Sequence, residues 1–346
     1  MSFFAVLFAL IIEQARPLAR ANWIHAGFQG WARWTSRSLD AGQPHHGWIV
    51  WTVAVLVPTL VTVLVHFLLF QINFLLSFAW SVAILYVTLG FRQFSHYFTD
   101  IRNALDDGDE DTARDLLAQW RHVDAAQLPR SEVVRHVIEY SVLAAHRHVF
   151  GVLGWFSVLA ALGLGPAGAV LYRLSEFLSR YWLHNHPTSI SGDETPSQNL
   201  QAVAAKAWGM IDYVPARVTS LGFAVVGSFE DAIDAWRSYL QRFPATPLVA
   251  SENRNDGVIL AATSGAVNVR LGGEALKAAR SSEFSSLAHQ SGPVGGLDAE
   301  GASAEETMPG REPELAHLRS IVGLVWRSVV LWMGMLALLT LAQLLG

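Results

Sequence analysis

The stretch Asn255 to Gly273, NDGVILAATSGAVNVRLGG, combines small residues with a single arginine, Arg270. The pattern predicts a small-residue helix or helix pair that stops at Gly272 and Gly273. Glycine allows a backbone to approach a ligand closely, and a guanidinium offers planar paired donors to an anion such as phosphate. An arginine can equally cap the end of a helix, where a cation meets free carbonyl groups. Spacing alone leaves both interpretations of Arg270 open.

A second candidate is the segment Asp212-Tyr-Val-Pro-Ala-Arg217, which lies at the edge of an apolar stretch. Charges in apolar surroundings are costly, so Asp212 and Arg217 either pair with each other or face a polar site. The first alternative predicts a structural ion pair at a helix broken by Pro215. The second makes both residues candidates for a functional site.

Two other patterns have a simpler structural explanation. The segment Gly163-Leu-Gly-Pro-Ala-Gly168 matches the dinucleotide-binding fingerprint, but it lies within an apolar segment, where glycines allow close helix packing or a break. Alternating acids from Asp107 to Asp111 suggest a calcium-binding loop, but the glycine and glutamate required at its sixth and twelfth positions are missing. We therefore expect two helices joined by a turn at Gly108.

Histidines are the remaining candidates for metal ligands. Three closely spaced pairs occur: His45 with His46, His146 with His148, and His184 with His186. No carboxylate or cysteine completes a ligand set at metal-binding spacing, so these histidines are predicted to lie in interfaces or loops. His66 stands within an apolar span and is expected to pair across helices, although a polar group there is also a functional candidate. The chain has no cysteine, which excludes disulfides, thiolate metal sites and cysteine nucleophiles.

The elements that must position these residues belong to a membrane protein. Of the 346 residues, 52% are hydrophobic and only 15% are charged, whereas a soluble domain usually carries about a quarter charged residues. The mean hydropathy is +0.30. The mild net charge of −5 argues against nucleic acid as a partner and leaves membrane lipid as the expected one.

The apolar run 3–12 is expected to form a short first helix, and five longer apolar runs are the other candidates for membrane spans. The runs 48–70 and 72–90 are each long enough to cross about 30 Å of hydrocarbon and are predicted to form a tight hairpin. The run 321–345 is a strong final span, 150–174 is bent by its glycines, and 208–229 is weaker. The predicted fold is therefore an all-α polytopic integral membrane protein with about five transmembrane helices and cytoplasmic helical segments.

These runs divide the chain into six predicted parts. In order they are N-terminal transmembrane helices with the hairpin (1–92), a cytoplasmic helical segment (93–149), central membrane segments (150–229), a cytoplasmic signature segment (230–280), a disordered linker (281–316) and a C-terminal transmembrane helix (317–346). Arginines concentrate in the segments 14–47, 92–147 and 230–320, so the positive-inside rule places these segments in the cytoplasm. The linker is too rich in Ser, Gly, Ala and Glu to bury a core.

Several blocks between Ala104 and Gly273 together resemble the CobD/CbiB family of membrane proteins of cobalamin biosynthesis. The family's "AL..GD...AR..L" block is similar to the segment 104–117, and its "R...E" block to Arg135 and Glu139. Its "IPARL" block is similar to 214–218, its "AWR" block to 235–237, and its "GALGVRLGG" block to 265–273. The resemblance thus covers about half of the chain, and its last two blocks are the most specific.

The chain also departs from the family pattern. The early "GDP...HPV" block has no counterpart between Ile11 and Asp40. The "ENTSDG" block falls on residues 143–148, which read Leu-Ala-Ala-His-Arg-His, and the "NTLDSM" block falls on 176–181, with Ser179 at the aspartate position. The missing groups are those that a ligase would use for nucleotide, metal or substrate. A second resemblance, to the AmpE proteins linked to β-lactamase regulation, rests on the segment 212–217.

Two functions follow from these resemblances. The CobD/CbiB resemblance implies a multi-pass protein of the bacterial inner membrane that joins an aminopropanol-type amine to the carboxylate of adenosylcobyric acid, giving adenosylcobinamide or its phosphate. A corrinoid is then the substrate, with ATP and magnesium as cofactors of such a ligase. The implied catalytic residues are Asp212 and Glu139, and the implied substrate-binding residues are Arg217, Arg270, Asn255, Trp236 and Arg237. The AmpE resemblance implies instead a non-catalytic modulator of cell-wall signalling. No metal ligand and no oligomeric state follow from either resemblance.

Overall fold

A computed structural model describes residues 2–16, 23–121, 125–184, 196–243, 251–272 and 310–345. Helices make up nearly all of these residues, which contain no β-strand beyond one isolated bridge between Val269 and Arg311. The elements are α1 Ser2–Ala15, α2 Trp23–Leu39, α3 Pro44–Ile72, α4 Phe74–Thr88, α5 Phe91–Asp106, α6 Glu110–Arg121, α7 Arg130–Ala145, the π-helix η1 His146–Phe150, α8 Gly151–Ala161, α9 Ala167–His184, α10 Gln198–Val226, α11 Phe229–Arg242, α12 Ser251–Val267 and α14 Leu315–Leu345. The all-α prediction is confirmed.

The chain divides into two compact units, which are described separately. Unit 1 comprises Met1–Gln93, Arg147–Pro215 and Met333–Gly346, and unit 2 comprises Phe94–His146 and Ala216–Trp332. The predicted linker falls mainly on residues 281–309, which lie outside the described part of the chain, as does Gly273.

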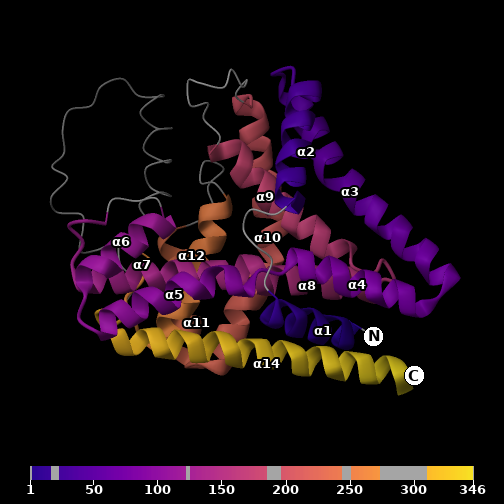
Figure 1. The fold of residues 1–346 in the computed structure, drawn as a ribbon. Coiled ribbons are helices and arrows are strands. Elements are labelled where there is room, and N and C mark those ends of the chain that lie inside the picture. Colours follow the sequence, from indigo (N-terminus) through magenta and orange to yellow (C-terminus); the bar gives the residue numbers. More distant parts are fainter. Residues whose placement is uncertain are drawn as a thin grey trace. The chain divides into compact units, whose positions relative to one another are not determined.

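The predicted hairpin in unit 1 is formed by α3 and α4, which meet at the right of Figure 1. Helix α3 begins at Pro44 and has 29 residues, a length of roughly 40 Å at 1.5 Å per residue. The break falls at Asn73, whose backbone is extended and whose Oδ1 accepts a hydrogen bond from the Leu75 amide at 2.8 Å. An asparagine N-cap therefore starts α4 one residue after α3 ends.

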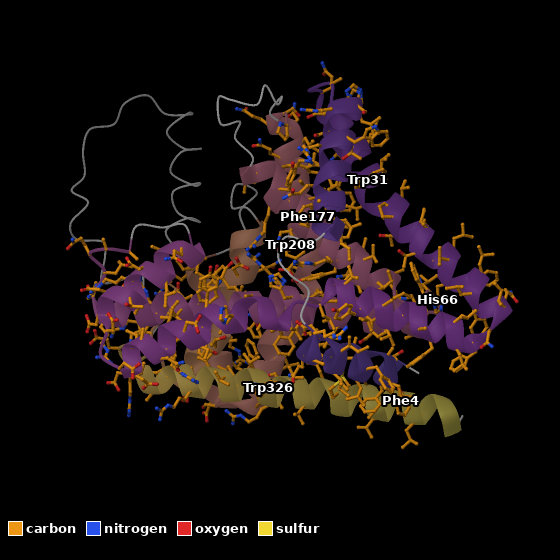
Figure 2. All side chains as sticks on the ribbon, viewed as in Figure 1. Phe4, Trp31, His66, Phe177, Trp208 and Trp326 are labelled. Atoms are coloured by element: carbon orange, nitrogen blue, oxygen red, sulfur yellow. The ribbon has the colours of Figure 1, made fainter. Side chains whose placement is uncertain are left out.

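The glycine-rich turn between α8 and α9 has the structural role that the sequence predicts. Gly163 and Gly165 adopt positive φ angles of +79° and +58°, which favour glycine. A side chain on Gly165 would overlap the ring of His66, and one on Gly168 would overlap the backbone of Trp155. His66, labelled in Figure 2, places Nδ1 3.2 Å from the Ser77 hydroxyl of α4, so the expected pairing across helices is confirmed.

Three stretches of the described chain are long and apolar enough to cross a membrane: His45–Ile72, Arg130–Ala161 and Leu315–Ala342. Two shorter apolar helices, Ser2–Ala15 and Phe74–Thr88, accompany them. The second span runs without interruption through α7, η1 and α8 and thus crosses the predicted boundary at residue 149. Many apolar side chains on these helices are exposed, among them Phe4 and Trp326 in Figure 2. Exposed apolar side chains on helices of this length are stable in lipid and not in water, so the protein is a membrane protein.

In unit 2, α12 is the buried central helix, and it packs against α7 and α11. Its residues from Asn255 to Ala266 are all buried. A side chain on Gly257 would overlap the Tyr239 hydroxyl, and one on Gly265 would overlap the backbone carbonyl of Asp231. These glycines of α12 therefore allow α11 and α12 to approach each other closely.

Candidate functional site

Most of the residues implied by the resemblance lie in unit 2. Glu139 of α7 is 3% exposed, and its Oε1 accepts a hydrogen bond from the Gly272 amide at 2.7 Å. The same oxygen lies 3.8 Å from Nε of Arg135, one helical turn earlier. The "R...E" and "RLGG" segments, far apart in sequence, therefore meet at one buried carboxylate.

The segment after α12 is directed toward Glu139 by a reversal of the chain. Asn268 has a φ of +52°, the left-handed conformation that asparagine tolerates better than most residues. The Arg270 amide then donates to the Arg311 carbonyl at 2.8 Å, while the Arg270 side chain is exposed. Arg270 lies three residues beyond the last residue of α12, so its exposed guanidinium is accessible to an anion.

The second contact in unit 2 joins α10 to α12. Nη1 of Arg217 donates to Oδ1 of Asn255 at 2.9 Å, and Asn255 is 1% exposed. Arg254, Asp256 and Arg217 all act electrostatically on Tyr239 of α11. Burial raises the pKa of Tyr239 to about 12, against the opposing charge of Arg254, so its hydroxyl remains protonated at neutral pH.

Among the described residues of unit 2, three buried nitrogen donors have no hydrogen-bond partner: Nε of Arg135, Nε of Arg254 and Nε1 of Trp236. A buried donor without an acceptor is costly, so such donors indicate a place where a ligand supplies acceptors. Arg254 and Tyr239 were missed at the sequence level. The only signal for them was position, since Arg254 precedes Asn255 and Tyr239 follows Trp236 by one helical turn.

Trp236 and Arg237 of α11 do not lie in the same surroundings. Trp236 is half-buried, whereas the Arg237 side chain is 73% exposed and lies 4.0 Å from the Asp234 carboxylate. The structure gives Arg237 only this contact with a neighbour on its own helix. Its predicted role in binding substrate remains a prediction.

The Asp212 to Arg217 segment lies within one continuous helix. Pro215 lies inside α10, which continues from Gln198 to Val226, so the helix is not broken there as expected. Residues five apart on a helix point about 140° apart, and Asp212 and Arg217 each contact a residue of another helix. Asp212, 1% exposed, accepts a hydrogen bond from the Tyr172 hydroxyl at 2.8 Å within unit 1.

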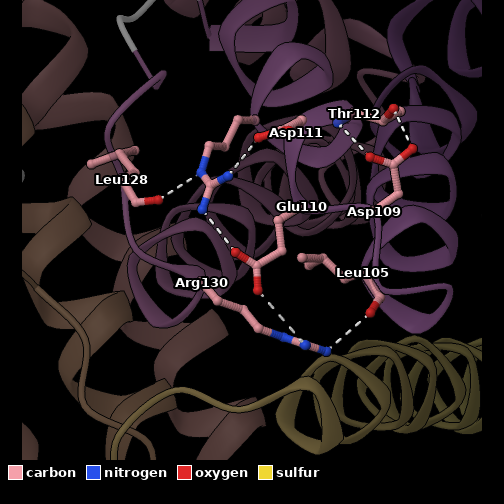
Figure 3. A network of polar contacts seen from close by, with 8 residues as sticks. Leu105, Asp109, Glu110, Asp111, Thr112, Leu128 and Arg130 are labelled. Carbon is pink, nitrogen blue, oxygen red and sulfur yellow. Dashed lines mark hydrogen bonds and ion pairs between the residues drawn. The ribbon is translucent and has the colours of Figure 1, made fainter.

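The "AL..GD...AR..L" block forms the polar network of Figure 3, and its contacts are structural. Asp109 caps α6 by accepting hydrogen bonds from the amide and hydroxyl of Thr112 at 3.0 and 2.6 Å. Arg114 binds Glu110 at 2.8 Å and donates to the Leu128 carbonyl. Gly108 adopts a φ of +81° in the turn, so the predicted helix–turn–helix is confirmed.

The histidines that the sequence offers as metal ligands lie in several different places. Within the described ranges, no group of three or more His, Asp and Glu residues is placed to hold a metal ion. His146 instead lies in a helix interface, with Nδ1 2.9 Å from the Thr219 hydroxyl. His45 and His46 contact each other edge to face, and residues 185–190, which include His186, lie outside the described part of the chain.

Comparisons with known proteins show what this chain is similar to. A family model described as "CobD/Cbib protein" matches residues 3–298. A cobalamin biosynthesis protein CobD of Stutzerimonas stutzeri (strain A1501) is 28% identical over 294 residues, covering 84% of this chain and 81% of the relative. Another protein of that name, from Chromobacterium violaceum, is 31% identical over 201 residues, which is 58% of each chain. No solved structure matches this chain.

Proposed function

Because the chain belongs to the CobD/CbiB family, we propose that it acts in cobalamin biosynthesis by forming the amide that converts adenosylcobyric acid to adenosylcobinamide or its phosphate. The observation that carries this proposal is the pair of contacts in unit 2, Glu139 with Gly272 and Arg217 with Asn255. They bring the matching blocks together in the part of the chain that also holds unpartnered buried donors. The AmpE-like alternative finds no support in the comparisons, and we do not propose it.

Amide formation from an amine and a carboxylate requires three things of the protein. The amine must lose a proton, the carboxylate must be held in place, and water must be kept away from the activated group. Glu139, as a buried carboxylate, is the candidate acceptor for the proton. Arg217, already aligned by Asn255, is the candidate for binding the substrate carboxylate or phosphate.

A ligase of this kind implies ATP as a cofactor. The hydrogen-bond donors of unit 2 show which residues could bind its phosphates. Nε of Arg254 has no hydrogen-bond partner and suits an anionic phosphate chain, so Arg254 would hold it, whereas Arg135 already forms ion pairs with Glu132 and Glu139. When bound, ATP would supply the activation of the carboxylate.

Asp212 and Arg270 keep the roles that the resemblance implies. Asp212 is proposed as an acid, base or ligand residue, acting together with the Tyr172 hydroxyl that it binds. Arg270 is proposed to bind an anionic group of the substrate, and its exposed side chain is accessible for this. The proposed location is the bacterial inner membrane, with several passes and with the segments around residues 121 and 285 in the cytoplasm. Reporter fusions at those two positions test the orientation.

Complementation is the direct test of the function. A bacterial strain that lacks this ligase cannot use cobyric acid for cobalamin-dependent growth, and expression of this chain should restore growth. The variant Arg217→Ala should restore none while accumulating in membranes at the normal level. Growth that fails with the wild-type chain, despite its normal membrane level, would reject the ligase.

A further inference from the structure

Unit 1 contains a second polar cluster, which the proposed mechanism does not use. Its centre is Glu176 of α9, whose side chain is 4% exposed. Oε2 of Glu176 lies 2.7 Å from Nη1 of Arg173, and Oε1 lies 3.1 Å from Nε of Arg180. Arg147 and His148 of η1 also act electrostatically on Glu176, and Arg147 is only 7% exposed. We define these five residues, with Ser179, as the α9 arginine cluster.

The six residues of the cluster include three guanidinium groups and one carboxylate. The three arginines and Glu176 are also the charged groups that act on His148. Asp212, whose Oδ1 is bound by the Tyr172 hydroxyl at 2.8 Å, acts electrostatically on Tyr172 together with Glu176 and Arg147. Guanidinium groups only donate hydrogen bonds and are always positively charged, so the donors of this cluster suit an anionic ligand and not a cation.

Polar atoms without partners give an independent indication of a ligand. The hydroxyl oxygen of Ser179 and Nδ1 of His148 are buried and have no hydrogen-bond partner in the structure. Ser179 is 3% exposed. It follows Tyr172 by seven residues and Glu176 by three, so it lies on the same face of α9 as both. An unsatisfied buried hydroxyl is destabilising, and an anion at this face would give it an acceptor.

The cluster is also accessible from outside. The side chains of Arg173 and Arg180 are 21% and 37% exposed, whereas Glu176 and Ser179 are buried. Arg173 and Arg180 thus extend from the buried polar groups Glu176 and Ser179 to the protein surface. Guanidinium groups with hydroxyl donors are the groups that bind tetrahedral oxyanions, because their donors match paired phosphate oxygens.

We propose that the α9 arginine cluster binds a phosphate group, carried either by a soluble phosphate compound or by a lipid headgroup. Ser179 donates a hydrogen bond to this phosphate, and Arg173 and Arg180 supply the charge. The site does not depend on the amide-forming function, because none of the six residues of the cluster has a role in that function. A binding experiment without any corrinoid therefore tests it separately.

The test is thermal unfolding of the full-length protein, purified in an uncharged detergent and titrated with inorganic phosphate. Sodium chloride at equal ionic strength is the reference. Phosphate should raise the Tm in proportion to its binding, and chloride should not. The variant Ser179→Ala should keep or raise the Tm without phosphate, because it removes an unpartnered hydroxyl. Its phosphate affinity should be weaker by about tenfold or more, the effect of losing a hydrogen bond to a charged group.

Ser175→Ala is the matched control, because Ser175 lies on the same helix and is also buried. Its hydroxyl is already satisfied by the Leu171 carbonyl at 2.7 Å. This variant should bind phosphate as the wild type does. Equal phosphate affinities for Ser179→Ala and Ser175→Ala would overturn the proposal.

The two sources of phosphate are separated in lipid nanodiscs without free phosphate. Discs with phosphatidic acid are compared with discs of phosphatidylcholine alone. Protection by phosphatidic acid that Ser179→Ala weakens would support a lipid headgroup. Protection by inorganic phosphate in detergent, with no difference between the discs, would support a soluble phosphate compound. No Ser179-dependent protection in any arm would overturn the site.

Discussion

The carboxylate of Glu139 binds the backbone amide of Gly272 at 2.7 Å, although 133 residues separate the two in sequence. This contact attaches the segment after α12 to α7. Glu139 therefore has a structural role in addition to the catalytic role proposed for it, and the two roles can be separated by substitution.

Glu139→Ala should destabilise the protein, because the Gly272 amide loses its acceptor in a buried place. The expected loss is about 1–3 kcal/mol of unfolding free energy, measured by thermal or denaturant unfolding in detergent. Glu139→Gln retains an oxygen acceptor but no proton-accepting carboxylate. It should therefore unfold like the wild type and fail in the complementation assay. A fully active Glu139→Gln variant would leave Glu139 with its structural role alone.

Gly265→Ala tests the packing of α12 against α11. The added methyl group would overlap the Asp231 carbonyl, and overpacking of this kind costs typically 1–3 kcal/mol. Gly323→Ala in α14 is the matched control, because a side chain there meets nothing within 4 Å. The control should be stabilised by up to about 1 kcal/mol through helix propensity. Equal unfolding temperatures for the two variants would contradict the close packing.

Arg270→Lys tests whether the exposed guanidinium binds an anion. Lysine keeps the charge but loses the planar fork, so growth in the complementation assay should be abolished while membrane level stays normal. A lysine would suffice if Arg270 only supplied positive charge near a chain reversal. Normal growth with Arg270→Lys would therefore remove Arg270 from the site.

Glu176 should make stability depend on pH in the acid range. Burial alone would raise its pKa, but Arg173 and Arg180 lower it from 4.5 to about 2. A lowered pKa in the folded state means that the contribution is complete above pH 4.5 and is lost as the pH falls toward 2. This contribution is on the order of 3 kcal/mol. The stability difference between wild type and Glu176→Gln should accordingly shrink over this interval, and a constant difference would refute the assignment.

Membrane association can be measured directly by washing membranes with high salt and with alkaline carbonate. The protein should remain in the pellet, because helices such as α3 carry a continuous apolar surface. A peripheral protein of similar size serves as the control that is released. Release of this chain into the supernatant would contradict a transmembrane arrangement of its apolar helices.

The sequence by itself determined the fold class, because apolar run length and low charge are local properties. It predicted the hairpin of residues 48–90, the turn at Gly108 and the structural role of the Gly163 to Gly168 segment. Each of these features depends on residues that are close together in the chain. The hairpin depends on an asparagine cap, the turn on a glycine with positive φ, and the glycine-rich segment on the apolar helices around it. The family resemblance likewise followed from short blocks in order.

Tertiary structure alone decided which of these residues meet. Asp212 and Arg217 are close together in sequence, but Tyr172 and Asn255, which they contact, come from other helices and are far away in the chain. The sequence predicted an apolar run only from residue 150, whereas the apolar stretch extends from Arg130 to Ala161 and includes the buried charged residues Glu139 and Arg147. Contacts between distant segments depend on how helices pack, and composition does not record packing.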